Sequence, residues 1–139
     1  MILLIRGRGI STGKASGPLL VSPQPISFLG GVDPESGIIV EKGHPLNGQC
    51  IAGKVLVFPY GKGSTVGSYV LYALSQNKHA PTAIVNAEAE AIIATGAIIG
   101  KIPMIDRIDV SLTRLKDGTH VTVDGGIGEM EYEGELAPA

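Results

Sequence analysis

Three continuous apolar runs in the middle of the chain constrain its fold more than any other feature. They are "KVLVFP" (54–59), "TAIVN" (82–86) and "IPMID" (102–106), and such runs are typical of strands buried on both faces. Between the first two runs, apolar residues recur every four positions, which predicts a helix that begins near Ser64. "AEAEAIIAT" (87–95) predicts a second, short helix. Strand, helix, strand, helix, strand indicates a small parallel α/β unit.

Short β segments flank this unit on both sides. Three runs punctuated by glycine and proline precede it, at 2–7, 15–22 and 37–43. Two more follow it, at 112–126 and 127–133. The predicted fold class is therefore a β-rich α/β domain, with a β shell around the α/β insert. We expect residues 1–139 to form one domain, because the chain shows no repeat or linker that would divide it.

The composition excludes several classes of protein. Hydrophobic residues make up 44% of the chain and charged residues 17%, which argues against disorder and suggests that a partner covers some apolar surface. A net charge of −2 with 4% aromatic residues gives no basis for binding nucleic acid. The absence of a long apolar run predicts a cytoplasmic chain that does not enter a membrane. The single cysteine, Cys50, cannot by itself hold a metal or an iron–sulfur cluster.

A glycine-rich loop lies in "FPYGKGSTVGSYVLYAL" (58–74), between the first buried strand and its helix. Unpaired amides at a helix N-terminus favour an anion, so this loop is a candidate anion-binding or catalytic site. In the alternative interpretation, Ser64 only caps the helix. Glycine at position 67 weakens the first turn by up to roughly 1 kcal/mol relative to alanine, which suggests that a ligand approaches the backbone closely. "GQCIAGK" (48–54) matches part of a Walker A motif, but Val55 follows it, so we interpret it as a turn.

The flanks of Ser64 do not match a serine hydrolase. "GKGSTVG" is not G-x-S-x-G, and the three histidines lie in unrelated contexts where structural or solvated roles are expected: His44, His79 and His120. A reactive serine here would need activation by loop amides, by the helix N-terminus and by the charge of Lys62.

Four further residues are weaker candidates for ligand binding: Arg8, Gly31, Asp33 and Asn86. An arginine such as Arg8 can clamp a carboxylate or phosphate with two hydrogen bonds, although surface arginines are common. Asn86 ends a buried strand, as Asp106 does, and that edge of an α/β sheet favours ligands; a helix N-cap is the alternative for Asn86. Glu88 and Glu90 are expected on a solvated helix face.

Five blocks of the sequence resemble the small subunit of the aconitase X family: "GRGISTGKASGPLLVS", "PISFLGGVDPESG", "GKVLVFPYGKGSTVGSYVLY", "NAEAEAIIATGAIIGKIPMID" and "VTVDGG". They cover nearly the whole chain in order. The resemblance implies a swivelling β/β/α, barrel-like domain similar to the mobile domain of aconitase. It also implies a separate large subunit that carries a [4Fe-4S] cluster, with no cofactor on this chain and no activity from this chain alone.

The reaction that the resemblance implies is the reversible dehydration of (R)-5-phosphomevalonate to trans-anhydromevalonate 5-phosphate, in an archaeal mevalonate route to isoprenoids. The matching position makes Ser64 the proton acceptor, with the cluster of the large subunit as Lewis acid. Supporting roles in substrate binding are inferred from the loop itself, for Lys62, Gly63, Thr65, Gly67 and Ser68.

Three alternatives stay open at the level of sequence. Other members of the aconitase X group dehydrate hydroxyproline, often with both parts in one chain. A swivelling phosphohistidine carrier domain has a similar "VTVDGG" end but needs a histidine in its mobile loop, and residues 61–68 contain none. In a pure binding or scaffolding module, Ser64 would only cap a helix.

Overall fold

The structure is a computed structural model that describes residues 1–138, so the expected domain boundary at residue 139 lies outside the described residues. The strands are β1 (Ile2–Arg6), β2 (Arg8–Ser11), β3 (Lys14–Val21), β4 (Val55–Phe58), β5 (Ala83–Asn86), β6 (Met104–Asp106), β7 (His120–Asp124) and β8 (Glu129–Glu133). The helices are α1 (Phe28–Gly31), α2 (Gly67–Gln76), α3 (Ala91–Ile99) and the 3₁₀ helix η1 (Leu112–Arg114).

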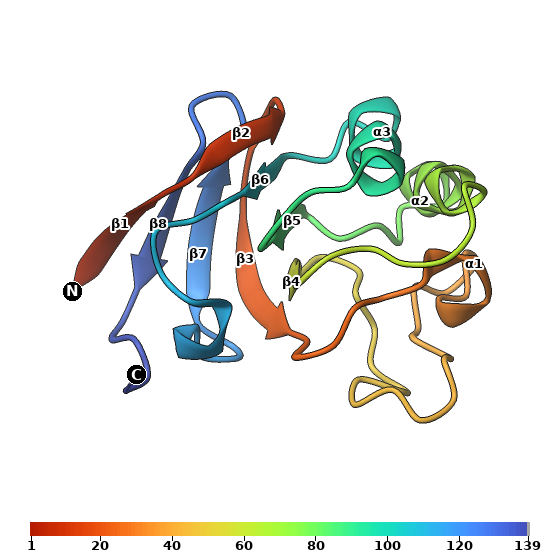
Figure 1. Ribbon diagram of the computed structural model, residues 1–139, viewed down its shortest axis with the longest axis horizontal. Coiled ribbons are helices and arrows are strands. Elements are labelled where there is room, and N and C mark those ends of the chain that lie inside the picture. Colours follow the sequence, from red (N-terminus) through yellow and green to blue (C-terminus); the bar gives the residue numbers. More distant parts are fainter. Residues whose placement is uncertain (139) are drawn as a thin grey trace.

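The strands form one sheet in the order β1-β8-β7-β3-β4-β5-β6-β2. Strands β3 to β6 run parallel to one another, which confirms the predicted parallel unit, and the remaining pairs are antiparallel. The two edge strands, β1 and β2, follow each other in the sequence with only Gly7 between them, so the sheet curls toward a barrel (Figure 1). A side chain at Gly7 would overlap the carbonyl oxygen of Asp106, so glycine is required at this crossing.

Alternation along the parallel strands creates two hydrophobic cores. In β4, Val55 and Val57 belong to the core between the two halves of the curled sheet, whereas Leu56 and Phe58 pack toward the helices. Helices α1, α2 and α3 lie together on one side of the molecule, opposite β1, β7 and β8 (Figure 1). The result is three layers, β, β and α, which confirms the predicted fold class.

The structure differs from the predictions in three places. Residues 37–43 form only isolated bridges, from Ile39 to Val32 and from Ile38 to Cys50, because their partners are single residues outside the strands of the sheet. Strand β2 was not predicted. Both helices begin later than predicted, α2 at Gly67 and α3 at Ala91. Within residues 1–138, no helix is long and apolar enough to cross a membrane.

Candidate active site

The loop of residues 59–66 leaves the carboxyl end of β4 and leads to α2. Its first part is held firmly: the Ile26 amide donates to the Tyr60 carbonyl at 3.4 Å, and the Lys62 amide donates to the Ile26 carbonyl at 3.1 Å. Gly61 is buried, and a Cβ there would overlap Ile93 and lie 3.0 Å from Glu90 Oε1. The next five residues, 62–66, are all exposed. The loop is therefore anchored at its base and open to solvent at its tip.

Ser64 lies at this exposed tip and not at the helix cap. Its Oγ accepts a hydrogen bond from the Val66 amide at 3.1 Å, and its carbonyl accepts from the Gly67 amide at 3.0 Å. The N-cap of α2 is Val66, which makes no capping bond through its side chain. These two bonds cap the turn that leads into α2, while the N-cap of the helix itself is Val66. Within residues 1–138 its hydroxyl proton has no acceptor in hydrogen-bonding geometry, so the hydroxyl group can act on a ligand.

The backbone around Ser64 offers three consecutive amides. Across the part of the chain that the structure describes, the amides of Gly63, Ser64 and Thr65 have no hydrogen-bond acceptor. Gly63 has a φ of +96°, and a Cβ there would lie 2.7 Å from the hydroxyl of Ser27, so only glycine suits this position. Successive free amides in a turn are a backbone arrangement that favours an anion.

The other loop residues predicted to bind substrate differ in how free they are. Lys62 Nζ forms an ion pair with Glu41 Oε2 at 3.2 Å. The Ser68 hydroxyl donates to the Thr65 carbonyl at 3.1 Å, which tightens the turn before α2. At Gly67 an added Cβ would meet its nearest atom at 3.6 Å, an ordinary contact, so packing alone does not require glycine there. These roles in binding stay predictions.

Arg8 is already occupied by a carboxylate of its own chain. Its guanidinium donates two hydrogen bonds to Asp106, at 2.9 and 2.8 Å, and these bonds raise the pKa of Arg8. Asp106 is fully buried and also accepts from the Ala89 amide at 2.7 Å. The pair therefore ties β2, β6 and the turn before α3 together.

The remaining weaker candidates also have partners within the chain. Asp33 closes its own turn by accepting from the Glu35 amide at 3.1 Å and the Ser36 hydroxyl at 2.9 Å. Asn86 is fully buried, and its Nδ2 donates to the Phe58 carbonyl at 3.0 Å. Gly31 is buried and leaves room for the carboxylate of Glu41, whose Oε1 lies 3.1 Å from the Cβ that another residue would have. Within residues 1–138, none of these three residues makes a hydrogen bond to the loop tip at 62–66.

Sequence reasoning missed the role of Glu90 and misplaced Glu88. Both precede α3, so the expectation of a solvated helix face was wrong. Glu90 is the N-cap and accepts from the Ile92 and Ile93 amides at 2.9 and 2.6 Å. Glu88 pairs with Arg107 at 2.7 Å, and hydrogen bonds from that guanidinium lower the pKa of the carboxyl. An acidic residue just before an apolar helical run is the signal that could have identified the cap.

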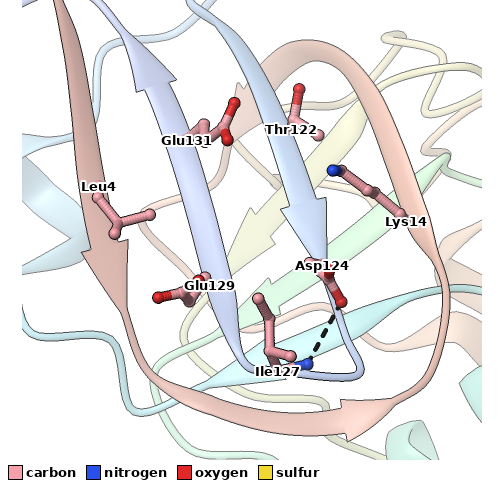
Figure 2. A pocket seen from close by; sticks show the side chains of 7 residues that line it. All are labelled: Leu4, Lys14, Thr122, Asp124, Ile127, Glu129 and Glu131. Carbon is pink, nitrogen blue, oxygen red and sulfur yellow. Dashed lines mark hydrogen bonds between the residues drawn. The ribbon is translucent and has the colours of Figure 1, made fainter.

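A hollow on the other side of the molecule does not suit a substrate. It lies on the outer face of the sheet formed by β1, β8, β7 and β3, where the side chains point to solvent (Figure 2). Its lining consists of Leu4, Lys14, Thr122, Asp124, Ile127, Glu129 and Glu131. The volume of about 40 Å³ has room for little more than a water molecule.

The side chains of this chain do not fit an iron–sulfur cluster. Cys50 is the only cysteine, and its Sγ contacts the Ser36 carbonyl oxygen at 3.5 Å. Residues 1–138 contain no group of three side chains placed to hold a metal ion. His44 is buried, with its Nδ1 accepting from the Leu46 amide at 3.0 Å, and His120 pairs with Glu133, so these two histidines have structural contacts.

Fold and loop together define a small β/β/α domain that presents a serine-containing loop on its surface instead of enclosing it. A sequence model of the aconitase X swivel domain matches residues 4–132, and the chain belongs to this family. The chain is 59% identical over 127 residues to the phosphomevalonate dehydratase small subunit of Thermococcus kodakarensis, covering 91% of this chain and 94% of that protein.

Two further comparisons agree. The phosphomevalonate dehydratase small subunit of Methanocella arvoryzae is 56% identical over 128 residues, covering 91% of this chain and 97% of that protein. The crystal structure of Thermococcus kodakaraensis aconitase X in its holo-form superposes with a TM-score of 0.91 at 55% identity, covering 95% of this chain and 99% of that chain.

Proposed function

We propose that this chain is the small subunit of a phosphomevalonate dehydratase, a hydro-lyase of the mevalonate pathway, and that Ser64 is its proton acceptor. The observation that carries the proposal is the exposed loop, in which the Ser64 hydroxyl lies among three amides without acceptors. The names of the relatives, at 59% and 56% identity over nine-tenths of the chain, supply the substrate class.

The dehydration requires removal of a proton next to a carboxylate and departure of a β-hydroxyl. A neutral serine is a weak base, so the alkoxide must be stabilised where it forms. The free amides of Gly63, Ser64 and Thr65, together with the ammonium of Lys62, supply positive potential at this point. That stabilisation grows when water is excluded, which requires a second surface over the loop.

A larger partner subunit would provide that second surface. Apolar and aromatic side chains are exposed around the loop: Leu29, Val66, Tyr69 and Tyr72 are 46%, 44%, 71% and 41% exposed. Exposed apolar and aromatic side chains near a reactive group are typical of a binding interface. Because the donors on this chain do not fit an iron–sulfur cluster, we assign the [4Fe-4S] cluster of the predicted enzyme to the partner, and we expect no activity from the small subunit alone.

The test is the variant Ser64→Ala, combined with the large subunit and assayed on 5-phosphomevalonate. Loss of a general base lowers turnover by about 10³-fold, while association of the subunits is unchanged because the hydroxyl makes few contacts. Ser16→Ala is the matched control, since Ser16 is exposed on β3 and bonds only to Thr122. Substantial activity of the Ser64→Ala complex would exclude Ser64 as the base.

A further inference from the structure

The ammonium of Lys62 is held by a carboxylate that no sequence motif had indicated. Lys62 Nζ lies 3.2 Å from Glu41 Oε2, and the two residues come from segments 21 positions apart. An ammonium group has three N–H donors, so one bond to Glu41 leaves two for another ligand. The lysine side chain is 46% exposed, so its two remaining donors are accessible to a ligand.

Glu41 itself is fixed in place from several directions. Its amide donates to the Gly31 carbonyl at 3.2 Å, and its carbonyl accepts from the His44 amide at 3.2 Å and the Asn47 side chain at 3.0 Å. The absence of a side chain at Gly31 leaves room for the carboxylate. Its side chain is 24% exposed, about half as exposed as that of Lys62. The backbone of Glu41 is thus fixed, and its carboxylate is the less exposed member of the pair.

The second carboxylate oxygen shows that the pair is not built for stability alone. Glu41 Oε1 is buried and has no hydrogen-bond partner within residues 1–138. Buried acceptors in native proteins almost always have a partner, so an unpaired one asks for a functional reason. Here the unpaired oxygen belongs to Glu41, the residue that pairs with Lys62, and Lys62 is the only cationic side chain of the loop 59–66.

We propose that Glu41 is a positioning residue, which holds the Lys62 ammonium in place to receive the anionic group of the substrate beside Ser64. A lysine on its flexible stem loses much of its rotamer freedom when it binds an anion, and a partner that orders it beforehand reduces this loss. The inference rests on the proposed function, since it names how one substrate-binding side chain of that same site is oriented.

The test compares Glu41→Ala, Lys62→Gln and the double variant in the assembled complex. Because Glu41 acts through Lys62, Glu41→Ala raises KM by about tenfold with kcat within twofold, and the double variant is no worse than Lys62→Gln alone. Glu41→Gln keeps an acceptor and recovers part of the loss. Glu35→Ala, on an exposed glutamate of the same segment, leaves both constants unchanged. Effects that add in the double variant, or a fall in thermal stability with KM unchanged, would overturn the proposal.

A second measurement does not depend on turnover. In the full chain labelled with ¹⁵N-lysine, inorganic phosphate shifts the Lys62 ammonium signal by NMR, and Glu41→Ala weakens that response severalfold. An equal response in both proteins would refute the positioning role, whatever reaction the complex catalyses. If the wild-type complex fails to convert 5-phosphomevalonate, the proposed function fails, and the phosphate titration still decides the role of Glu41.

Discussion

Two loops follow neighbouring parallel strands and meet at the same edge of the sheet, but their polar groups are used in opposite ways. In the loop after β4, three consecutive amides, at 63–65, lack acceptors within the described residues. In the turn after β5, the amides of Ala87 and Glu88 donate to the Pro59 carbonyl, and that of Ala89 donates to Asp106.

The caps of the two following helices show the same contrast. Helix α3 has a side-chain cap in Glu90, whereas the N-cap of α2, Val66, makes no capping bond through its side chain. A turn whose amides all have hydrogen-bond acceptors stabilises the fold, while a turn with free N–H donors can bind a ligand. The difference favours the first loop as the proposed site and a supporting role for the second.

Among the variants that test this comparison of the two loops, the largest expected effect comes from adding one methyl group to the open loop. Gly63→Ala places a Cβ at 2.7 Å from Ser27 Oγ on a backbone with φ of +96°, so the loop must change conformation. We expect kcat/KM of the complex to fall about 10²-fold, because misplacement of a catalytic group by about 1 Å has this effect. Steady-state assays measure it.

The control for this variant is Gly118→Ala. Gly118 has a similar φ of +82°, but nothing lies within 4 Å of an added Cβ, so it carries the backbone strain without the collision. It should lose some stability and keep its activity. If the two variants behaved alike, the loop conformation would not matter for turnover.

The second expected effect is on the free energy of unfolding, and it comes from a change at the hydrogen-bonded turn after β5. Asp106→Asn puts an amide group where a fully buried carboxylate accepts from both Arg8 and Ala89, so at least one donor then faces another donor. The buried amide of Ala89 or one N–H of Arg8 then lacks its acceptor, and the loss of a buried hydrogen bond of this kind costs about 1 to 3 kcal/mol. Urea denaturation measures the change in the midpoint.

Asp109→Asn is the matched control for Asp106→Asn. Asp109 is exposed and accepts only from the Arg6 amide, a bond that the amide oxygen of asparagine keeps. Its free energy of unfolding should change by less than about 0.5 kcal/mol. Equal midpoints for the two variants would show that the corner formed by Arg8 and Asp106 does not support the fold.

The sequence predicted the loop after β4 better than the hydrogen-bonded turn after β5, and the reason is physical. Apolar runs and glycines are local signals, and they correctly indicated β4, β5, β6 and the position of the loop. The contacts of Arg8 with Asp106 join residues 98 positions apart, and those of Glu41 with Lys62 join residues 21 apart. No periodicity announces such pairs. The prediction of a strand at 37–43 was wrong for a related reason: a local sequence pattern does not provide a neighbouring strand to pair with.

The smallest expected effect concerns the ion pair between Glu88 and Arg107, on the exposed side of the turn after β5. Hydrogen bonds from Arg107 lower the pKa of Glu88, so this carboxyl contributes stability above its unfolded pKa and loses that contribution as the pH falls through the folded value. Both side chains are more than half exposed, so screening by solvent keeps the effect small.

Arg107→Gln should return the pKa of Glu88 toward its ordinary value, as NMR titration of the carboxyl carbon would measure. Arg6→Gln, which removes a different pair with Glu129, should leave the Glu88 titration where it was. If Arg107→Gln left the pKa of Glu88 unchanged, only Asp106 and Glu90 would hold the turn after β5. The exposed side of this turn would then be as free of contacts as the tip of the loop at 62–66.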